Sequence, residues 1–331
     1  MRRKKKKRVM FGILGILIVG ATFIFIRPSM ELEVFGAIRD LPILSYLGEY
    51  KENLDEDELL EQARVELSFA RARTYNEVDF TMSSNQALLI NLSTMDVLFE
   101  HGAHERVYPA SLTKMMTVLL GITHGQGDTM IVQADFDQLL LSNASVVGFS
   151  PGEVQPASVV LHGAMLASGA DATATIAHHV SRTYVDFVGL MNEKARELGM
   201  VNTHFMNSSG LHHPEHYTTA YDMAILLRYA LENPTFRAIF TERQYSFIDW
   251  SGVQQPIYST LFANISSAEF AGGRIIGGRT GFTSEAGRCL ASFATDGVDE
   301  FILITFGAGV DAADHKAHFV DGRMIYNYFL Q

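Results

Sequence analysis

Residues 108–122 read YPASLTKMMTVLLGI, a proline followed by a mostly apolar run. A proline ahead of an apolar helical run is a common start for a buried helix, because its fixed φ suits the first turn and its missing N–H would have no partner there. If the helix begins near Pro109, Ser111 lies in the first turn and Lys114 follows one turn later on the same side. The pattern therefore predicts a Ser-x-x-Lys pair whose side chains touch at the start of a buried helix.

The two residues of this pair can act as a nucleophile and its base. Lys114 lies among Met115, Met116 and Val118 and close to the positive end of the helix, so its ammonium form is disfavoured and its pKa should fall. A neutral lysine can then take the proton of Ser111. Taken alone the tetrapeptide is weak evidence, because a Ser-x-x-Lys arises by chance about once in a chain of this length. An ordinary surface serine and lysine are the alternative.

Two further elements follow the pair in the order that penicillin-interacting enzymes show. In those enzymes a Ser-x-x-Lys precedes a Ser-x-Asn type of element and then a Lys-Thr-Gly strand. Here Ser168 lies in MLASGADAT, and the segment 279–281 in IIGGRTGFT reads Arg-Thr-Gly. Ala170 stands where an asparagine is expected, and Arg279 stands where a lysine is expected. The order and the broad spacing therefore fit, and the residue types fit in part.

The order of strand and helix patterns along the chain predicts an α+β fold. ALLINL and VLFEHG, separated by STMD, predict a β-hairpin, and GGRTGF, GRCLASFAT and EFILITFGA predict successive antiparallel strands near the end. Between them, GAMLASGADATATIAHHV, VDFVGLMNEKARELGM and TTAYDMAILLRYALENPTF have helical spacing, and residues 312–329 predict a closing helix. Strands at both ends with helices between them predict one sheet built from distant parts of the chain.

Charge is divided unevenly along the chain. The first eight residues, MRRKKKKR, hold seven of the 26 Lys and Arg, which leaves 19 basic against 37 acidic residues in the remainder. Nucleic-acid binding needs clustered Lys and Arg on the folded part, so we expect no nucleic-acid partner. The single cysteine, Cys289, excludes an intrachain disulfide.

The amino terminus predicts attachment to a membrane. Residues 9–26 contain no charged side chain, and at about 1.5 Å per residue they span roughly 27 Å, close to a hydrocarbon core of about 30 Å. The positive charge of residues 1–8 favours a cytoplasmic tail, so the chain is expected to cross the cell membrane once and to place its body outside. A cleaved signal peptide, cut after residues 19–21 (VGA), is the competing interpretation and exports the body as well.

The body as a whole resembles one protein family. Over roughly residues 85–310 it is similar to the low-molecular-mass D-alanyl-D-alanine carboxypeptidases, the penicillin-binding proteins of serine peptidase family S11. The segments that carry the similarity are RVYPASLTKMMT, SPGE, MLASGADAT, FVGLMNEKARELGMVNTHFMNSSGL, HYTTAYDMAIL and GGRTGFTSEAGRCLASFA. Residues 81–331 would then be the catalytic penicillin-binding domain. Residues 27–80, with a helix in DEDELLEQARVELSFARAR, would be a linker or stalk.

This resemblance implies a fold and an activity. The fold is that of serine β-lactamases and transpeptidases, in which helices flank an antiparallel sheet and a mainly helical lobe is inserted between its strands. The activity is removal of the terminal D-alanine from peptidoglycan stem peptides that end in D-Ala-D-Ala. Ser111 would attack the carbonyl between the two D-alanines, Lys114 would take its proton, and Ser168 would pass a proton to the departing nitrogen. Water would then release the acyl group, and β-lactam antibiotics would acylate the same serine as covalent inhibitors.

The resemblance also implies how the substrate would be held. Arg279 and Thr280, together with Gly281, would bind its terminal carboxylate. The backbone N–H groups of Ser111 and Phe282 would form the oxyanion hole, which stabilises the negative charge that develops on the attacked carbonyl.

The two substitutions within the motifs leave other functions open. Arg279 keeps the charge and can bind a carboxylate with two prongs, but it is expected to lose the contact that a compact ammonium makes with Ser168. Ala170 removes an amide that would help to hold the substrate or Lys114. A wall-binding or regulatory protein with little or no turnover is therefore the main alternative. A β-lactamase is a further one, although no glutamate motif for its deacylating water is visible.

Three histidines, His212, His213 and His216, crowd one loop. Clustered histidines can bind zinc, but the chain contains no HExxH and no cysteine close to them in sequence. We interpret them as a polar loop, and we expect neither a metal nor a cofactor.

Overall fold

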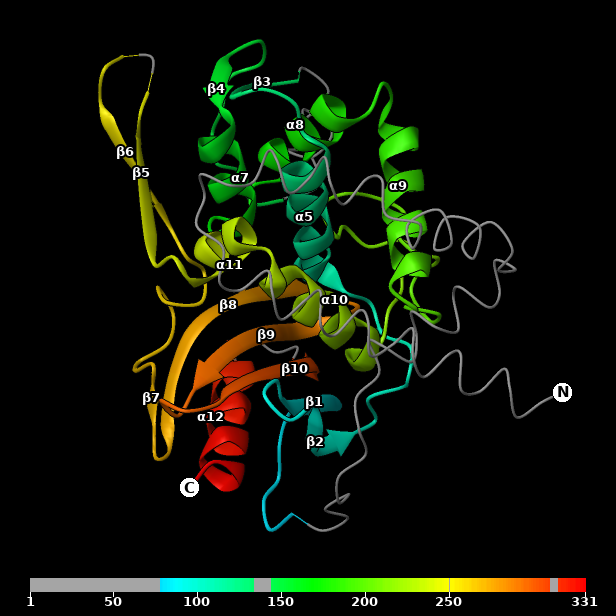
Figure 1. The fold of residues 1–331 in the computed structure, drawn as a ribbon, viewed down its shortest axis with the longest axis vertical. Helices are drawn as coiled ribbons and strands as arrows, with labels where there is room; N and C mark the ends of the chain where they lie inside the picture. The colour runs from blue at the N-terminus through cyan, green and yellow to red at the C-terminus, as the bar shows by residue number, and fades with distance from the viewer. Residues whose placement is uncertain (1–77, 134–143, 250, 310–314) are drawn as a thin grey trace, which may run out of the picture. The chain divides into compact units, whose positions relative to one another are not determined.

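The structure is a computed structural model that describes residues 78–133, 144–249, 251–309 and 315–331. The predicted basic tail and anchor, and the predicted stalk up to residue 77, lie outside these residues. Within the part of the chain that is described, no helix has the length and the apolar character needed to cross a membrane. Helices and strands carry the labels of Figure 1.

One antiparallel sheet of six strands, in the order β2-β1-β10-β9-β8-β7, organises the described chain. The strands are β1 (Gln86–Asn91), β2 (Asp96–His101), β7 (Glu269–Phe270), β8 (Gly273–Thr283), β9 (Gly287–Thr295) and β10 (Glu300–Ala308). β1 pairs with β2 and, on its other side, with β10, so early and late segments lie side by side (Figure 1). The predicted hairpin, the three late strands and the sheet built from distant segments are confirmed.

Helices make up most of the regular structure between β2 and β7, and one more helix follows β10. They are η2 (Ala110–Thr113), α5 (Lys114–His124), α7 (Ala157–Met165), α8 (Ala170–Val180), α9 (Tyr184–Glu197), α10 (Ala220–Glu232), α11 (Pro234–Thr241) and α12 (Ala317–Phe329). α5, α7, α8 and α9 pack on one another as the expected helical lobe. The predicted closing helix is present as α12, although residues 312–314 of its predicted range lie outside the described residues.

Both faces of the sheet are covered, which explains why β9 and β10 are buried along nearly their whole length. Side chains alternate between the two faces of a strand, so Leu88 and Ile90 of β1 enter one core while Ala87 and Leu89 enter the other. α10 and α11 pack on the first face, and α12 packs on the second (Figure 1). The helical lobe therefore lies on the same side of the sheet as α10 and α11.

The helical run predicted over residues 163–180 is wrong in one respect, because the chain leaves the helix between α7 and α8. Ser168 in this break has a φ of +66°, and the N–H of Gly169 donates to the carbonyl of Gly163 at 3.0 Å instead of continuing the helical ladder. Apolar spacing does not reveal such a break, since the residues on both sides of it are buried. The break puts Ser168 on a loop, where its side chain can face the start of α5.

Two small antiparallel pairs were not predicted. They are β3 (Thr129–Ile131) with β4 (Val154–Pro156), and β5 (Gln244–Ile248) with β6 (Gln254–Tyr258). The hairpin of β5 and β6 extends beside the helical lobe (Figure 1). Its strands are largely exposed or half-buried, so they lack the clear alternation of apolar and polar residues that marks a strand in sequence.

A buried carboxylate fixes α12 to the chain just ahead of β1. Asp321 is buried, and its carboxylate accepts hydrogen bonds from the backbone N–H of Ser83 at 3.0 Å and of Ser84 at 2.7 Å. The hydroxyl of Ser84 donates to the same carboxylate at 2.6 Å. These three bonds join the last helix to the first strand of the sheet.

We expect Asp321→Ala to lower the free energy of unfolding by about 2–4 kcal/mol, because it leaves buried donors of Ser83 and Ser84 without acceptors. Urea denaturation of the full-length chain measures the change. Asp128→Ala removes an exposed carboxylate and is the matched control, with an expected change within about 0.5 kcal/mol. Equal midpoints for the two variants would contradict the role given to Asp321.

Candidate active site

Ser111 and Lys114 meet where the central helix begins, as predicted. Pro109 precedes the 3-10 turn η2, which carries Ser111, and α5 starts at Lys114. Lys114 Nζ lies 3.1 Å from Ser111 Oγ, within hydrogen-bond distance. Ala110 has a φ of +44°, a conformation that is costly for a residue with a side chain. The turn that presents Ser111 is therefore held by its surroundings and not by local preference.

Burial favours the neutral form of the Lys114 amine. The side chain is only 3% exposed, and its Nζ donates a hydrogen bond to the carbonyl of Ser209. Burial lowers the pKa of Lys114 well below its ordinary value, and the nearby charge of Arg279 lowers that pKa further, while Asp171 acts in the opposite direction. The neutral amine has a lone pair that can accept the hydroxyl proton of Ser111.

Ser168 completes a group of three side chains. Its Oγ lies 3.1 Å from Ser111 Oγ, and the guanidinium of Arg279 donates to the same oxygen from Nη2 at 2.6 Å. Because Ser168 accepts from Arg279, its own hydroxyl proton is left to donate toward Ser111 or toward a ligand in the cleft. The structure thus brings together Ser111, Lys114 and Ser168, the three residues predicted to carry the chemistry.

Arg279 corrects one expectation, because its guanidinium keeps the contact with Ser168 that it was expected to lose. Nε donates to the carbonyl of Ser111 at 3.2 Å, and Nη1 donates to the carbonyl of Met165 at 2.6 Å. The side chain has no exposed surface, and burial lowers its pKa to about 9, which leaves it cationic at neutral pH. Its charge therefore acts from behind Ser168, and the guanidinium fork is not exposed in the cleft.

Thr280, Gly281 and Phe282 follow Arg279 along β8. The first two are predicted to bind the substrate carboxylate with Arg279, and the third is predicted to form the oxyanion hole with Ser111. Thr280 Oγ1 donates to Thr260 Oγ1 at 2.9 Å. A Cβ on Gly281 would lie 2.9 Å from the backbone N of Ser111, so only a glycine lets β8 approach η2 this closely. Phe282 is 49% exposed beside the same turn. The roles of these residues toward a ligand stay predictions, but the strand passes directly along the nucleophile as those roles require.

Ala170 is hydrogen-bonded to a wall of the cleft, formed by Ala144 and Ser145, that sequence reasoning missed. Its side chain is buried, and its N–H donates to the carbonyl of Ser145 at 2.8 Å. The adjacent carboxylate of Asp171 accepts from three successive backbone N–H groups, those of Val147, Gly148 and Phe149, at 2.9 to 3.2 Å. Residues 144–149 are thus fastened to the start of α8. No signal in the sequence links these segments, because the donors to Asp171 are main-chain N–H groups, which every residue type except proline carries.

These elements enclose a cleft of about 680 Å³. Among the residues that line it are Ser111, Lys114, Ala144, Ser145, Ser168, Ser209, Gly210, Leu211, His212, Phe282, Thr283, Ser284 and Glu285. The cleft lies between β8, the start of α5 and the helical lobe. This is the junction of the sheet and the helical lobe.

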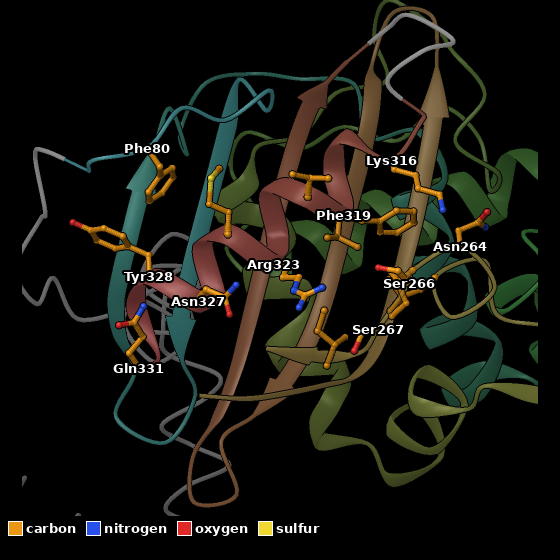
Figure 2. Close-up of a pocket in the computed structure, with 16 residues that line it drawn as sticks. Phe80, Asn264, Ser266, Ser267, Lys316, Phe319, Arg323, Asn327, Tyr328 and Gln331 are labelled. Atoms are coloured by element: carbon orange, nitrogen blue, oxygen red, sulfur yellow. The ribbon is translucent and has the colours of Figure 1, made fainter. Parts of the chain in front are cut away.

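Another pocket lies on the opposite face of the sheet and is separate from this site. It measures about 550 Å³ and is lined by α12 and by residues 264–267 (Figure 2). Lys316 and Arg323 contribute its positive charge, and Phe80 contacts Tyr328 edge to face at its border. None of the predicted site residues lines it.

The three clustered histidines lie in different surroundings. His216 is buried, and its Nδ1 accepts from the N–H of Met206 at 3.3 Å while its Nε2 is 2.9 Å from Thr113 Oγ1. Burial, together with neighbouring positive groups, lowers the pKa of His216 to about 3, so this residue is neutral at ordinary pH. His212 lines the cleft and His213 is exposed. Among the described residues, no group of three or more His, Cys, Asp or Glu side chains is placed to hold a metal ion.

Comparison with solved structures gives the class of protein that this fold and site define. The crystal structure of a Streptomyces DD-transpeptidase matches with a TM-score of 0.66 and 25% identity, covering 76% of this chain and 99% of that chain. A D-alanyl-D-alanine carboxypeptidase structure from Mycobacterium tuberculosis matches with a TM-score of 0.67 and 24% identity, covering 78% and 97%. The chain has the α+β penicillin-binding fold of the DD-transpeptidases, which confirms the predicted fold class.

Comparison of sequences gives the family. The peptidase S11 pattern, D-alanyl-D-alanine carboxypeptidase, matches residues 72–310. The D-alanyl-D-alanine carboxypeptidase DacF of Bacillus subtilis is 33% identical over 73% of this chain and 61% of its own length. DacA of Escherichia coli is 32% identical over 66% of this chain and 55% of its own length. The chain belongs to the peptidase S11 family, and it spans between 55% and 61% of the length of these two relatives.

We expect Gly281→Ala to slow covalent labelling of Ser111 by a fluorescent penicillin by about tenfold or more, because the added Cβ pushes β8 away from the nucleophile. The rate of labelling measures the effect. Gly189→Ala, on α9, adds a methyl group into open space and should label at the wild-type rate. If Gly281→Ala also labelled at that rate, the close approach of β8 would not be needed for the reaction of Ser111.

Proposed function

We propose that this chain is a serine-type D-Ala-D-Ala carboxypeptidase that removes the terminal D-alanine of peptidoglycan stem peptides through an acyl-enzyme on Ser111. The observation that carries the proposal is the position of Ser111 Oγ, 3.1 Å from Lys114 Nζ and 3.1 Å from Ser168 Oγ, at a cleft. Membership of the S11 family supports the reaction type. A nucleophile that contacts both a neutral amine and a second hydroxyl has the partners that acyl transfer needs.

Acylation begins when Lys114 Nζ takes the proton of Ser111 Oγ. The oxygen then attacks the carbonyl carbon of the penultimate D-alanine, and a bond forms between this carbon and Oγ. The carbonyl oxygen becomes negatively charged and is stabilised by the N–H groups of Ser111 and Phe282. The terminal carboxylate of the substrate lies toward Thr280, within the positive field of the buried Arg279.

Collapse of this intermediate breaks the peptide bond and expels the terminal D-alanine. Its nitrogen takes a proton from the hydroxyl of Ser168, and Ser168 takes back a proton from the protonated Lys114. Arg279 holds Ser168 Oγ from behind and so fixes the direction of its proton. Water then attacks the ester carbonyl and gives a proton to Lys114. The ester bond breaks, Ser111 Oγ takes this proton from Lys114, and the shortened peptide is released as a carboxylic acid.

Two further parts of the proposal concern location and inhibition. The uncharged residues 9–26 behind a basic tail would hold the catalytic domain outside the cell membrane, where peptidoglycan lies. A β-lactam carries a strained amide in place of the scissile peptide bond, so it would acylate Ser111 and inhibit the enzyme. Neither part needs a metal or a cofactor, since the proposed steps use the side chains and main chain of the cleft.

D-Alanine release from a peptide ending in Lys-D-Ala-D-Ala tests the proposal on the full-length chain in detergent. We expect wild type to release D-alanine and Ser111→Ala to lose at least about a thousandfold of the rate, because no other nucleophile contacts Lys114 among the described residues. Ser93→Ala removes an exposed hydroxyl in the turn between β1 and β2, outside the cleft, and is the control. Binding of penicillin without D-alanine release would instead favour a wall-binding protein, and transfer to an added amine without hydrolysis would favour a transpeptidase.

The acylation of Ser111 should depend on pH with a definite sign. Lys114 must be neutral to act, and its pKa lies well below 10.5, so the rate of penicillin labelling should rise with pH and level off above that lowered pKa. Lys114→Arg keeps its proton at every usable pH and should lower the rate by about a hundredfold or more. A labelling rate that fell as the pH rose, or an active Lys114→Arg variant, would remove Lys114 from the role of base.

A further inference from the structure

The direction of the substrate along β8 follows from the proposed function, on which this inference rests. The terminal carboxylate lies toward residues 279–280, and the attacked carbonyl lies at Ser111 beside Gly281. The peptide therefore continues past Phe282 toward Ser284 and Glu285. The residue that precedes the two D-alanines lies one further step along, about 3.3–3.6 Å for an extended chain, so its side chain emerges near Glu285.

A pocket with no assigned role opens at this point. It measures about 420 Å³ and shares Glu285 with the catalytic cleft, so the two hollows adjoin. Arg106, Tyr108, Glu215 and Tyr217 line its other sides. The rings of Tyr108 and His212 contact edge to face at 4.6 Å, with Tyr108 in the pocket and His212 in the cleft.

The pocket is lined by one guanidinium, that of Arg106, and by two carboxylates, those of Glu215 and Glu285, of which only Glu285 also lines the cleft. The guanidinium of Arg106 stacks over the ring of Tyr217 at 4.2 Å, and it forms no ion pair with a carboxylate among the described residues. Glu285 is exposed, and hydrogen bonds, first of all from its own backbone N–H, lower the pKa of its carboxyl group. Arg106 thus has unused donors in a fixed orientation, and Glu285 offers an anion at the border with the cleft.

From this arrangement we infer that the pocket binds the side chain of the third stem-peptide residue, and that this side chain ends in both an ammonium and a carboxylate, as in diaminopimelic acid. The ammonium pairs with Glu285, and the carboxylate takes a two-pronged contact from Arg106. A lysine side chain brings its ammonium to Glu285 but gives Arg106 no anion. An acetylated lysine satisfies neither group. Arg106 and Glu285 are therefore specificity-determining residues that act on substrate binding.

The inference is tested by comparing three peptides on the full-length chain in detergent. Each ends in X-D-Ala-D-Ala, where X is diaminopimelic acid, lysine or Nε-acetyl-lysine. We expect kcat/KM of wild type to fall about tenfold or more from the first peptide to the third, with lysine between them. Arg106→Gln should lower the value for the diaminopimelic peptide to that for lysine and leave the other two within about twofold. Glu285→Gln should bring the lysine peptide close to the acetylated peptide and lower the value for the diaminopimelic peptide, which should stay above both because its carboxylate still contacts Arg106.

Two controls separate this inference from the proposed function. Arg182→Gln and Glu193→Gln change exposed residues in or next to α9 and should keep the wild-type order of peptides. The rate of penicillin labelling, which does not involve X, should be the same in all variants and shows that Ser111 is intact. Equal kcat/KM for the three peptides, with D-alanine released from each, would overturn the inference and leave the carboxypeptidase standing. No release from any peptide would overturn the proposed function and the inference with it.

Discussion

The buried guanidinium of Arg279 is the interaction on which the rest of the site depends. Its three bonds reach the carbonyl of Ser111 in η2, the carbonyl of Met165 at the end of α7, and the hydroxyl of Ser168 in the break after α7. One side chain of the sheet thus joins the nucleophile turn to the helical lobe. An arginine suits this position because its planar fork has donors in several directions, whereas the compact ammonium of a lysine would act as a point charge.

The buried charge of Arg279 also affects the protonation state of Lys114. Arg279 and Lys114 are both almost completely buried, and two cations in one dry site repel each other. Lys114 is the residue that loses its proton, because a primary amine is deprotonated far more readily than a guanidinium. Asp171 supplies a buried negative charge nearby, but backbone N–H groups of residues 147–149 already occupy it. The neutral lysine that the proposed chemistry requires is therefore a product of the packing around it.

The parts of the site that follow from local geometry could be predicted from the sequence. Ser111 and Lys114 are three residues apart at the start of a helix, so their contact follows from helical periodicity. Ser168 could be placed by motif order, but the break that exposes it could not, since apolar spacing runs across it. The retained contact of Arg279 with Ser168 and the hold of Asp171 on residues 147–149 depend on segments far apart in sequence. Arg106 and Glu285 belong to no recognisable sequence motif and are far apart in the chain, so only the fold shows that they line the same pocket.

The contact between Gly281 and the nucleophile turn has a consequence for how the cleft can adapt. Because no side-chain atom separates β8 from the backbone of Ser111, and Arg279 ties the same strand to the same turn, this wall behaves as one rigid block. A bulky ligand cannot widen the cleft on that side without displacing the nucleophile itself. Any accommodation must come from the opposite wall, where residues 144–148 are half-buried or exposed and are fastened by hydrogen bonds between their main chain and the start of α8. One wall of the cleft is therefore rigid and positions Ser111, whereas the opposite wall is the one that can adjust to a bulky ligand.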